Sequence, residues 1–377
     1  MIVKNEAKVI ERCFDSVNSF VDEYVICDTG STDGTQEVMK NYWDRHGFTG
    51  EIINRPWVSF SHNRQEVFDL GKGRGDYIMT IDADEIFCSF EDNKPLMDRK
   101  VSSIPQFVGD RIEVSTYFPS LVYNRSQFFK DGLDWKWQWP IHEACSASDE
   151  KHVEYFTGVC VCPTDDGNPD RIADENHFHK DALVFENWVL DNPEDGRAWF
   201  YLAQSYRDAK KPALGVPALK KCIEFSNWGE ERYLAALRVG RYRLEAGEPM
   251  EDLINDFLMA HNLLPHRLEA LYTVVAFYRQ KDQFHTAIML GEQALNTPLP
   301  TDRLFVEPDT YEWKLKDEIA VAYYWVGRYE ESLALTQEAL DNPRANISEE
   351  SRERMLKNVK YAEEAIADAA KQEKSNG

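Results

Sequence analysis

The segment YIMTIDADEIF, residues 77–87, ends a run of apolar and β-branched residues with three carboxylates. The run predicts a buried strand, and Asp82, Asp84 and Glu85 follow at its end. Unpaired charge beside a core is costly, so these carboxylates either form an acidic surface turn or bind something positive. Hard cations such as Mg²⁺ and Mn²⁺ take oxygen ligands and often share them with substrate phosphates. The two aspartates therefore form a candidate metal site, although acidic turns are common without a metal.

Residues 1–120 alternate short apolar runs with amphipathic segments. We expect strands at 1–3, 23–28, 51–56 and 76–84, and helices at 6–20, 34–47 and 61–73. This alternation predicts βαβ units and an α/β domain with a Rossmann-like, mainly parallel sheet. Ligands bind outside the carboxyl ends of strands in such sheets. We therefore expect Asn5, Glu6 and Asp28 at the same edge as the three carboxylates.

Residues 196–372 contain four segments with one shared helix–turn–helix pattern. Tyr206, Tyr242 and Tyr278 are spaced 36 residues apart, and Tyr324 follows after 46, because a Pro-rich loop is inserted at 296–309. A period in the mid-thirties resembles the tetratricopeptide repeat, and an ordinary helical bundle is the alternative. Either arrangement is all-α. We expect residues 348–372 to form a polar capping helix.

The loop LDNPEDGRAW, residues 190–199, precedes the first of these segments. Its Pro and Gly residues mark a linker between two domains. We therefore predict an α/β domain at 1–187 and a tetratricopeptide-like helical domain at 188–377.

The formal net charge of −23 over 377 residues argues against nucleic acid or an anionic membrane surface as the main partner. No apolar run approaches the roughly 18 residues that a membrane-spanning helix needs. The seven cysteines have no framework spacing, which predicts a reducing, cytoplasmic setting. Cys160 and Cys162 alternate along a predicted strand. Without a second pair at metal-site spacing, we interpret them as small apolar residues and not as zinc ligands.

Four motifs occur in order: MIVKNEAKVIERCFDSV, DEYVICDTGSTDGT, HNRQEVFDLGKGRGDYIMTIDADE and WPIHEA. Together they resemble the family 2 glycosyltransferases with a GT-A fold, over about the first half of the chain. A glycosyltransferase domain followed by tetratricopeptide-like helices is similar to a subgroup that includes S-glycosyltransferases of bacteriocin peptides. The resemblance implies inverting transfer of a hexose from a nucleotide-sugar, with a UDP-sugar such as UDP-glucose as the expected donor and Mn²⁺ or Mg²⁺ as the cofactor.

The resemblance also implies roles for donor-side residues. Asp84 would be the metal ligand, Asp82 would contact ribose or metal, and Arg64 would bring positive charge to the diphosphate. Asp28 would hydrogen-bond the uracil or ribose, unless it only caps the helix that follows, and Arg64 has the alternative of a solvated helix residue. The nucleoside pocket and the strand end would be lined by Val3, Lys4, Asn5, Glu6 and Ala83.

The acceptor side is expected in DGLDWKWQWPIHEACSASDE, residues 131–150. An inverting transfer needs a general base, for which Glu143 is our first candidate and Asp134 the second. The alternative for Glu143 is a simple ion pair with a nearby cation. The alternating Trp135, Trp137 and Trp139 suit either stacking on sugar rings or packing in the core.

The metal site needs further ligands, and related enzymes often place a histidine downstream of the acceptor segment. Cysteines occupy that position in this chain, so His177 or His179 is the candidate substitute.

Two other functions fit parts of the sequence. A catalytically inactive sugar-nucleotide fold would act as an adaptor through its repeats, which bind peptides in a concave groove and could also pair two copies of the chain. A nucleotidyltransferase would need a Gly-rich, basic segment after the first strand, and VKNEAKVIER does not supply one. We expect a peptide, a glycan, a lipid or a small molecule as the acceptor.

Overall fold

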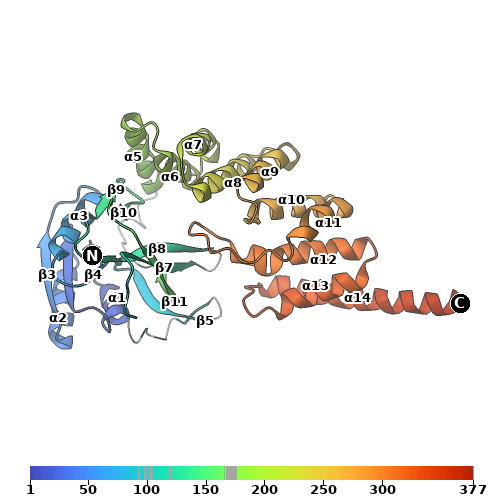
Figure 1. Ribbon diagram of the computed structural model, residues 1–377, viewed down its shortest axis with the longest axis horizontal. Coiled ribbons are helices and arrows are strands. Elements are labelled where there is room, and N and C mark those ends of the chain that lie inside the picture. Colours follow the sequence, from blue (N-terminus) through green and yellow to red (C-terminus); the bar gives the residue numbers. More distant parts are fainter. Residues whose placement is uncertain are drawn as a thin grey trace. The chain divides into compact units, whose positions relative to one another are not determined.

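Contacts between residues divide the chain after Trp188. The computed structural model describes residues 1–91, 94–96, 99, 101, 105–118, 121–164, 166 and 176–376. The first unit comprises residues 1–118 and 122–188, and the second comprises 189–377 with 119–121. Figure 1 shows strands with flanking helices in the first unit and only helices beyond α5 (His177–Asp191).

Three parallel strands open the first unit. They are β1 (Ile2–Val3), β2 (Glu23–Asp28) and β3 (Thr49–Asn54), in the order β1-β2-β3. The helices between and after them are α1 (Ile10–Val17), α2 (Thr35–His46) and α3 (Phe60–Gly71). The register pairs Val3 with Asp28 and Asp28 with Asn54, so the carboxyl ends of the three strands meet at one edge. Each of these predicted elements is present.

A second sheet has the strand order β4-β8-β7-β11-β5-β6. The strands are β4 (Tyr77–Met79), β5 (Glu85–Glu91), β6 (Lys94–Leu96), β7 (Arg111–Phe118), β8 (Leu121–Lys130) and β11 (Val153–Pro163). β11 runs parallel to β7, whereas it is antiparallel to β5, and β4 is antiparallel to β8. The parallel arrangement predicted from the sequence thus characterises the first sheet, and the second is mixed.

The strand expected at 76–84 is shorter than predicted. β4 ends at Met79, and the amide of Glu85 donates to the carbonyl of Asp82 at 3.1 Å, which forms a turn. β5 then begins at Glu85. The carboxylates therefore occupy the connection between two strands of the second sheet.

The core of this unit lies between α1 and the sheets. Ile10, Phe14 and Val17 recur at helical spacing on one face of α1 and are buried with Ile26 of β2 and Phe87 of β5. Apolar spacing of this kind directs one stripe of a helix against a sheet. The α/β fold class is confirmed.

The second unit is a series of helices that pack against their neighbours in the chain. They are α6 (Gly196–Asp208), α7 (Pro212–Phe225), α8 (Gly229–Glu245), α9 (Ile254–Leu263), α10 (Glu269–Gln280), α11 (Phe284–Gly291), α12 (Leu315–Trp325), α13 (Tyr329–Asp341) and α14 (Glu349–Asn376). The tetratricopeptide-like organisation is confirmed, and α14 covers the predicted capping helix. Among the described residues, no helix combines the length and apolar character that crossing a bilayer requires.

The four helix pairs share one turn. A residue with positive φ follows the first helix of each pair: Lys210 (φ 62°), Gly247 (φ 94°), Asp282 (φ 57°) and Gly327 (φ 83°). The amide of the next residue donates five positions back, as from Lys211 to Tyr206 at 2.8 Å and from Gln283 to Tyr278 at 2.9 Å. This is the Schellman pattern, which satisfies carbonyls at a helix end. The four segments therefore share the same turn between their two helices.

We expect Lys210→Gly to stabilise the helical unit. Lys210 is exposed and adopts a left-handed conformation that costs an L-residue about 1–2 kcal/mol. Glycine avoids this cost, but it also increases the conformational entropy of the unfolded chain, which reduces the gain in stability. The expected gain is up to about 1 kcal/mol in the free energy of unfolding, measured by urea denaturation. Gly247→Ala at the equivalent turn should lose stability, and equal effects of the two substitutions would contradict this explanation.

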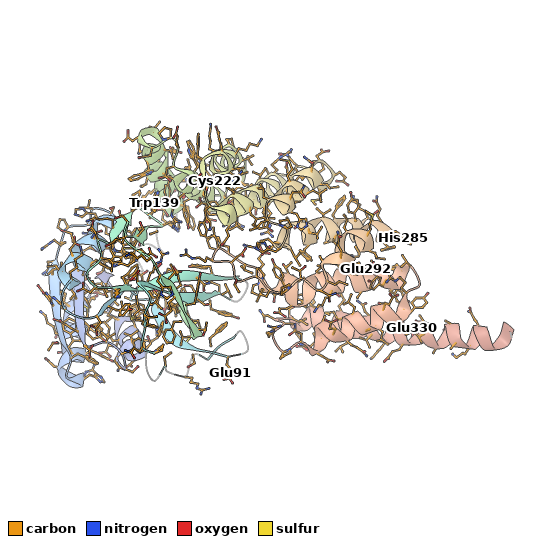
Figure 2. All side chains as sticks on the ribbon, in the orientation of Figure 1. Glu91, Trp139, Cys222, His285, Glu292 and Glu330 are labelled. Carbon is orange, nitrogen blue, oxygen red and sulfur yellow. The ribbon has the colours of Figure 1, made fainter. Side chains whose placement is uncertain are left out.

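Surface ion pairs reinforce one of these turns. Arg328, just after Gly327, donates to Glu292 at 2.9 Å, and Tyr323 donates to the same carboxylate at 2.8 Å. Glu292 is labelled in Figure 2. Exposed pairs of this kind contribute little, typically below about 1 kcal/mol.

The inserted loop at 296–309 is held by buried charge. Arg267 and Glu269 are both fully buried and pair at 2.9 Å. Arg267 also donates to the carbonyls of Leu304 (3.1 Å) and Phe305 (3.0 Å) in the loop. Tyr233 of α8 donates to Glu269 at 2.9 Å, and Tyr311 donates to it at 3.2 Å. The network thus connects α8, the start of α10, the loop and the segment before α12.

Candidate active site

The loops after β1 and β2 are hydrogen-bonded side by side at the carboxyl ends of their strands. Asn5 adopts φ 59°, its amide donates to the Ser31 hydroxyl at 3.0 Å, and its side chain accepts from the Thr32 amide at 2.8 Å. The carbonyl of Val3 accepts from the Thr29 amide at 3.0 Å. The expected meeting of these two strand ends is therefore present.

Asp28 organises the second of these loops. It is fully buried, and its carboxylate accepts from the amides of Gly30 (2.9 Å) and Ser31 (2.7 Å) and from the Gln36 side chain (2.6 Å). These contacts order the loop before α2, but the N-cap of α2 is Gly34, so Asp28 does not cap that helix, and its contact with the nucleoside stays a prediction. Glu6 is also buried, and its amide donates to the Thr35 hydroxyl at 2.9 Å, whereas Lys4 is exposed.

Arg64 connects the donor-side and acceptor-side candidates. It lies on α3, which Ser59 caps by accepting from the His62 amide at 3.2 Å. The guanidinium donates to Asp82 at 2.7 Å through one nitrogen and to Glu143 through another. Side-chain exposure is 11% for Arg64 and 11% for Glu143. The two carboxylates, 61 positions apart in the sequence, are therefore held on one buried cation.

Glu85, the third carboxylate of the acidic segment, has its own arginine. It is buried and accepts from Arg125 of β8, with the longer of two contacts at 2.6 Å. It also accepts from the Asp82 amide at 3.0 Å, which fixes the turn. Burial acts to raise the pKa of Asp82, but Arg64 and Arg125 outweigh it and hold that pKa below its usual value.

Asp84 differs from both neighbours. Burial, together with the negative charges of Asp82 and Glu85, raises the pKa of Asp84 to about 6. Among the ion pairs of the described residues, none involves Asp84, whereas Asp82 and Glu85 each pair with an arginine. Its backbone carbonyl accepts from Thr164, whose hydroxyl lies 2.7 Å away. Asp84 is thus a half-buried carboxylate close to the negative charges of Asp82 and Glu85. Such an environment suits a bound cation.

Among the described residues, no group of three potential ligand atoms close enough to share an ion contains Asp82 or Asp84. His177 and His179 lie in the first turn of α5. Within the described ranges, neither histidine forms with Asp82 and Asp84 a group of three ligand atoms close enough to share an ion. The fit to Mn²⁺ or Mg²⁺ therefore depends on Asp84 and Asp82, and the two histidines stay predictions.

The residues of the acceptor segment, 131–150, differ in how deeply they are buried. Trp135 is buried with Phe129 and Cys145, whereas Trp137 lies under Arg64, with the guanidinium 5.4 Å from the ring centre. Asp134 pairs with Lys136 at 2.7 Å and is 66% exposed. No contact among the described residues joins Asp134 to Arg64 or Glu143. Glu143 is the acceptor-side carboxylate that the fold brings to the donor-side cluster.

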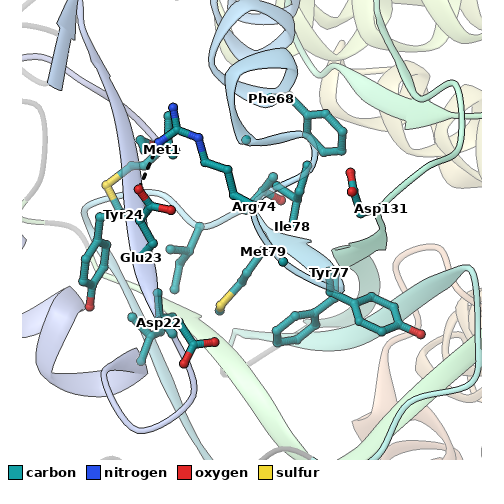
Figure 3. Close-up of a pocket in the computed structure, with 18 of the residues that line it drawn as sticks. Met1, Asp22, Glu23, Tyr24, Phe68, Arg74, Tyr77, Ile78, Met79 and Asp131 are labelled. Atoms are coloured by element: carbon teal, nitrogen blue, oxygen red, sulfur yellow. Dashed lines mark hydrogen bonds and ion pairs between the residues drawn. The ribbon is translucent and has the colours of Figure 1, made fainter. Parts of the chain in front are cut away.

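A cavity of about 830 Å³ opens beside this region (Figure 3). It lies between β2 and β4 and is lined by Glu23, Tyr24, Tyr77 and Met79, with Arg74 paired to Glu23 at 3.0 Å. These residues belong to the amino-terminal part of β2 and to β4, whereas the predicted donor edge is at the carboxyl ends. The cavity is therefore distinct from the carboxylate cluster, although Arg64 reaches its wall.

Two arginines of this region were not anticipated from the sequence. Arg125 neutralises Glu85, and Arg12 of α1 donates to both oxygens of Asp166 and to Thr164. Thr164 in turn holds the Asp84 carbonyl. A single arginine in a predicted strand or helix gives no local signal of its partner, because each pairing spans 40 or more positions.

Comparison with known proteins agrees with the fold. Residues 1–158 match the sequence profile of the family described as glycosyl transferase family 2. A TPR repeat-containing protein of Synechococcus elongatus is 26% identical over 207 residues, which cover 52% of this chain and 48% of that protein. The SPbeta prophage-derived glycosyltransferase SunS of Bacillus subtilis is 22% identical over 240 residues, covering 62% of this chain and 54% of SunS.

The matching regions thus span about half the length of these two relatives. A solved structure of MamA protein is similar to 46% of this chain and 86% of its own, with a TM-score of 0.35 and 17% identity. The resemblance predicted from the four sequence motifs is confirmed for the N-terminal part of the chain. Residues 1–158 therefore resemble the proteins of glycosyl transferase family 2.

Proposed function

We propose that this protein transfers a hexose from a nucleotide-sugar, with UDP-glucose as the first candidate, to an acceptor with inversion at the anomeric carbon. The single observation that carries the proposal is the bridge from Asp82 through Arg64 to Glu143, which unites the donor-side motif with the acceptor-side carboxylate. The match of residues 1–158 to the profile of glycosyl transferase family 2 supports glycosyl transfer as the reaction class. The seven cysteines are free thiols, which supports a cytoplasmic location.

Asp84, with Asp82, would hold Mn²⁺ or Mg²⁺. A bound divalent cation would neutralise the charge that develops on the diphosphate leaving group. Arg64 would add positive charge to the same diphosphate, and it donates to Glu143, which it would orient. The acceptor's oxygen or sulfur attacks the anomeric carbon, the bond from that carbon to the phosphate oxygen breaks, and Glu143 takes the acceptor's proton.

Glu143→Gln is expected to lower kcat by roughly 10²- to 10⁴-fold, the usual contribution of a general base. Glutamine keeps an oxygen that can accept from Arg64, so donor binding should be unchanged. The rate is measured as UDP release with acceptor present, and the donor Kd by calorimetry. A variant that loses donor affinity but keeps kcat would instead indicate that Glu143 only orients Arg64.

The proposed function is tested by a thermal-shift screen of the full chain with nucleotide-sugars, each with and without Mn²⁺. A ligand that binds only the native state stabilises it by about 2.7 kcal/mol at a hundredfold excess over its Kd. We expect one UDP-sugar to raise the Tm in the presence of Mn²⁺ and to have a much smaller effect without it.

Two results of this screen would redirect the interpretation. A rise that does not depend on metal would remove Asp84 as a ligand but keep the donor site. No rise with any nucleotide-sugar, in a protein that melts cooperatively, would favour the adaptor, in which the repeats bind a partner and the first unit is inactive.

A further inference from the structure

The fold brings together three cysteines that the sequence keeps far apart. Cys88 lies on β5, and Cys160 and Cys162 lie on the neighbouring strand β11. The antiparallel register places Cys160 directly opposite Cys88, with Cys162 diagonal to it. All three are buried and share one face of the sheet, whereas their neighbours Phe87 and Val161 point into the main core.

The three sulfur atoms form a nearly equilateral triangle. The Sγ–Sγ distances are 3.3 Å for Cys88–Cys162, 3.6 Å for Cys88–Cys160 and 3.7 Å for Cys160–Cys162. Each distance is within the range of a hydrogen bond between two thiols. The point in their plane equidistant from all three is about 2.0 Å from each, close to the roughly 2.3 Å of a Zn–S bond. An ion slightly out of the plane would reach all three without moving the backbone.

The three thiols interact with one another. Hydrogen bonds to Cys160 and Cys162 lower the pKa of the Cys88 thiol. Hydrogen bonds to Cys162 and Cys88, together with burial, raise the pKa of Cys160. Against the hydrogen bond to Cys160, which lowers it, the pKa of Cys162 is raised to about 12 by Cys88 and burial. The thiolate is the form that binds metals, so a cation would bind together with the loss of thiol protons. The interpretation of Cys160 and Cys162 as small apolar residues is therefore incomplete, because it lacked the third sulfur.

We propose that Cys88, Cys160 and Cys162 bind one thiophilic cation of the Zn²⁺ or Cu⁺ class. Soft sulfur ligands select these ions, whereas the carboxylate oxygens of Asp82 and Asp84 suit Mn²⁺ or Mg²⁺. Among the described residues, no fourth His, Cys, Asp or Glu joins the group, so Zn²⁺ would complete its coordination with water and Cu⁺ would be three-coordinate. Ile86, Phe90 and Tyr117 pack around the sulfurs and would shield the ion. The site is independent of the proposed transferase chemistry.

The test uses the reduced, metal-free full chain, titrated separately with Zn²⁺, Cu⁺ and Co²⁺. We expect one equivalent of Zn²⁺ or Cu⁺ per chain, a rise in Tm, and for Co²⁺ the near-ultraviolet charge-transfer absorption of a thiolate complex. Cys88→Ser should lose binding by at least tenfold in affinity. The matched control is Cys145→Ser, since Cys145 is equally buried but outside the cluster; Cys222 in the helical unit serves likewise (Figure 2).

If Cys88→Ser does not fold, the Co²⁺ absorption of the wild type still tests whether the thiols bind an ion, because it needs no variant. Cys162→Ala then replaces Cys88→Ser as the variant of the cluster. The proposal is overturned if no ion binds stoichiometrically, or if Cys145→Ser loses as much affinity as Cys88→Ser. A mass lower by two hydrogens, with no metal bound, would also overturn the proposal, because two of the three cysteines would then form a disulfide.

Discussion

Arg267→Ala should destabilise the helical unit by about 3–5 kcal/mol. The substitution removes the partner of a fully buried carboxylate, Glu269, and frees the carbonyls of Leu304 and Phe305. An uncompensated buried charge is among the costliest single changes that a core can receive. The measurement is urea denaturation of the full chain, followed by the helical signal in far-ultraviolet circular dichroism.

The control is the exposed pair of Lys281 and Glu251, which are 2.8 Å apart and each 53% exposed. Lys281→Ala should cost less than about 1 kcal/mol, because water screens both charges. Similar losses for Arg267→Ala and Lys281→Ala would show that the buried network contributes nothing beyond an ordinary ion pair.

Asp84→Asn should have opposite effects on function and stability. If Asp84 holds the cation, the variant loses several kcal/mol of transition-state stabilisation, which corresponds to a fall in kcat/KM of roughly 10³-fold or more. The same change removes a carboxylate crowded by Asp82 and Glu85, so the metal-free protein should become about 1–3 kcal/mol more stable at pH 8. Both quantities are measured on the same preparation.

The pH dependence of that gain follows from the pKa of Asp84, which is raised from 3.8 to about 6 in the native state. Between these values the native protein binds the additional proton, so the wild type gains stability as the pH falls from 6 towards 3.8. The advantage of Asp84→Asn should therefore be complete above pH 6 and vanish near pH 4. If the stability difference between Asp84→Asn and the wild type stays constant across this range, the pKa of Asp84 is not raised in the native state.

Local pattern predicted the elements of the chain well. The strand at 23–28 has the expected bounds, since a short apolar run with flanking turn residues is a short-range signal. The repeats were recognisable from tyrosine spacing, and the structure adds their shared turn, in which Lys210 and Asp282 occupy positions that usually favour glycine. At these two positions the sequence has no glycine to indicate the turn, because the turn is defined by its backbone hydrogen bond and not by the side chain.

Long-range pairing was not predictable in the same way. The motif residues Arg64, Asp82 and Glu143 were all identified, but nothing local indicated that one guanidinium holds both carboxylates. Nothing in the sequence around Cys88 indicated that it lies beside Cys160 and Cys162, because this contact arises from the pairing of β5 with β11. The register of antiparallel strands depends on the packing of the whole sheet, which a single sequence does not reveal.

The Arg64 bridge has a consequence for the order of binding. The cluster contains four carboxylates (Asp82, Asp84, Glu85 and Glu143) and two guanidinium groups (Arg64 and Arg125). With all six ionised, its net charge is two negative units, equal and opposite to one divalent cation. A free nucleotide diphosphate would meet repulsion, whereas the same nucleotide arriving with its cation, or after it, would not. In the proposed reaction, the charge balance of this small cluster would impose an order of binding, with the metal before or together with the sugar donor.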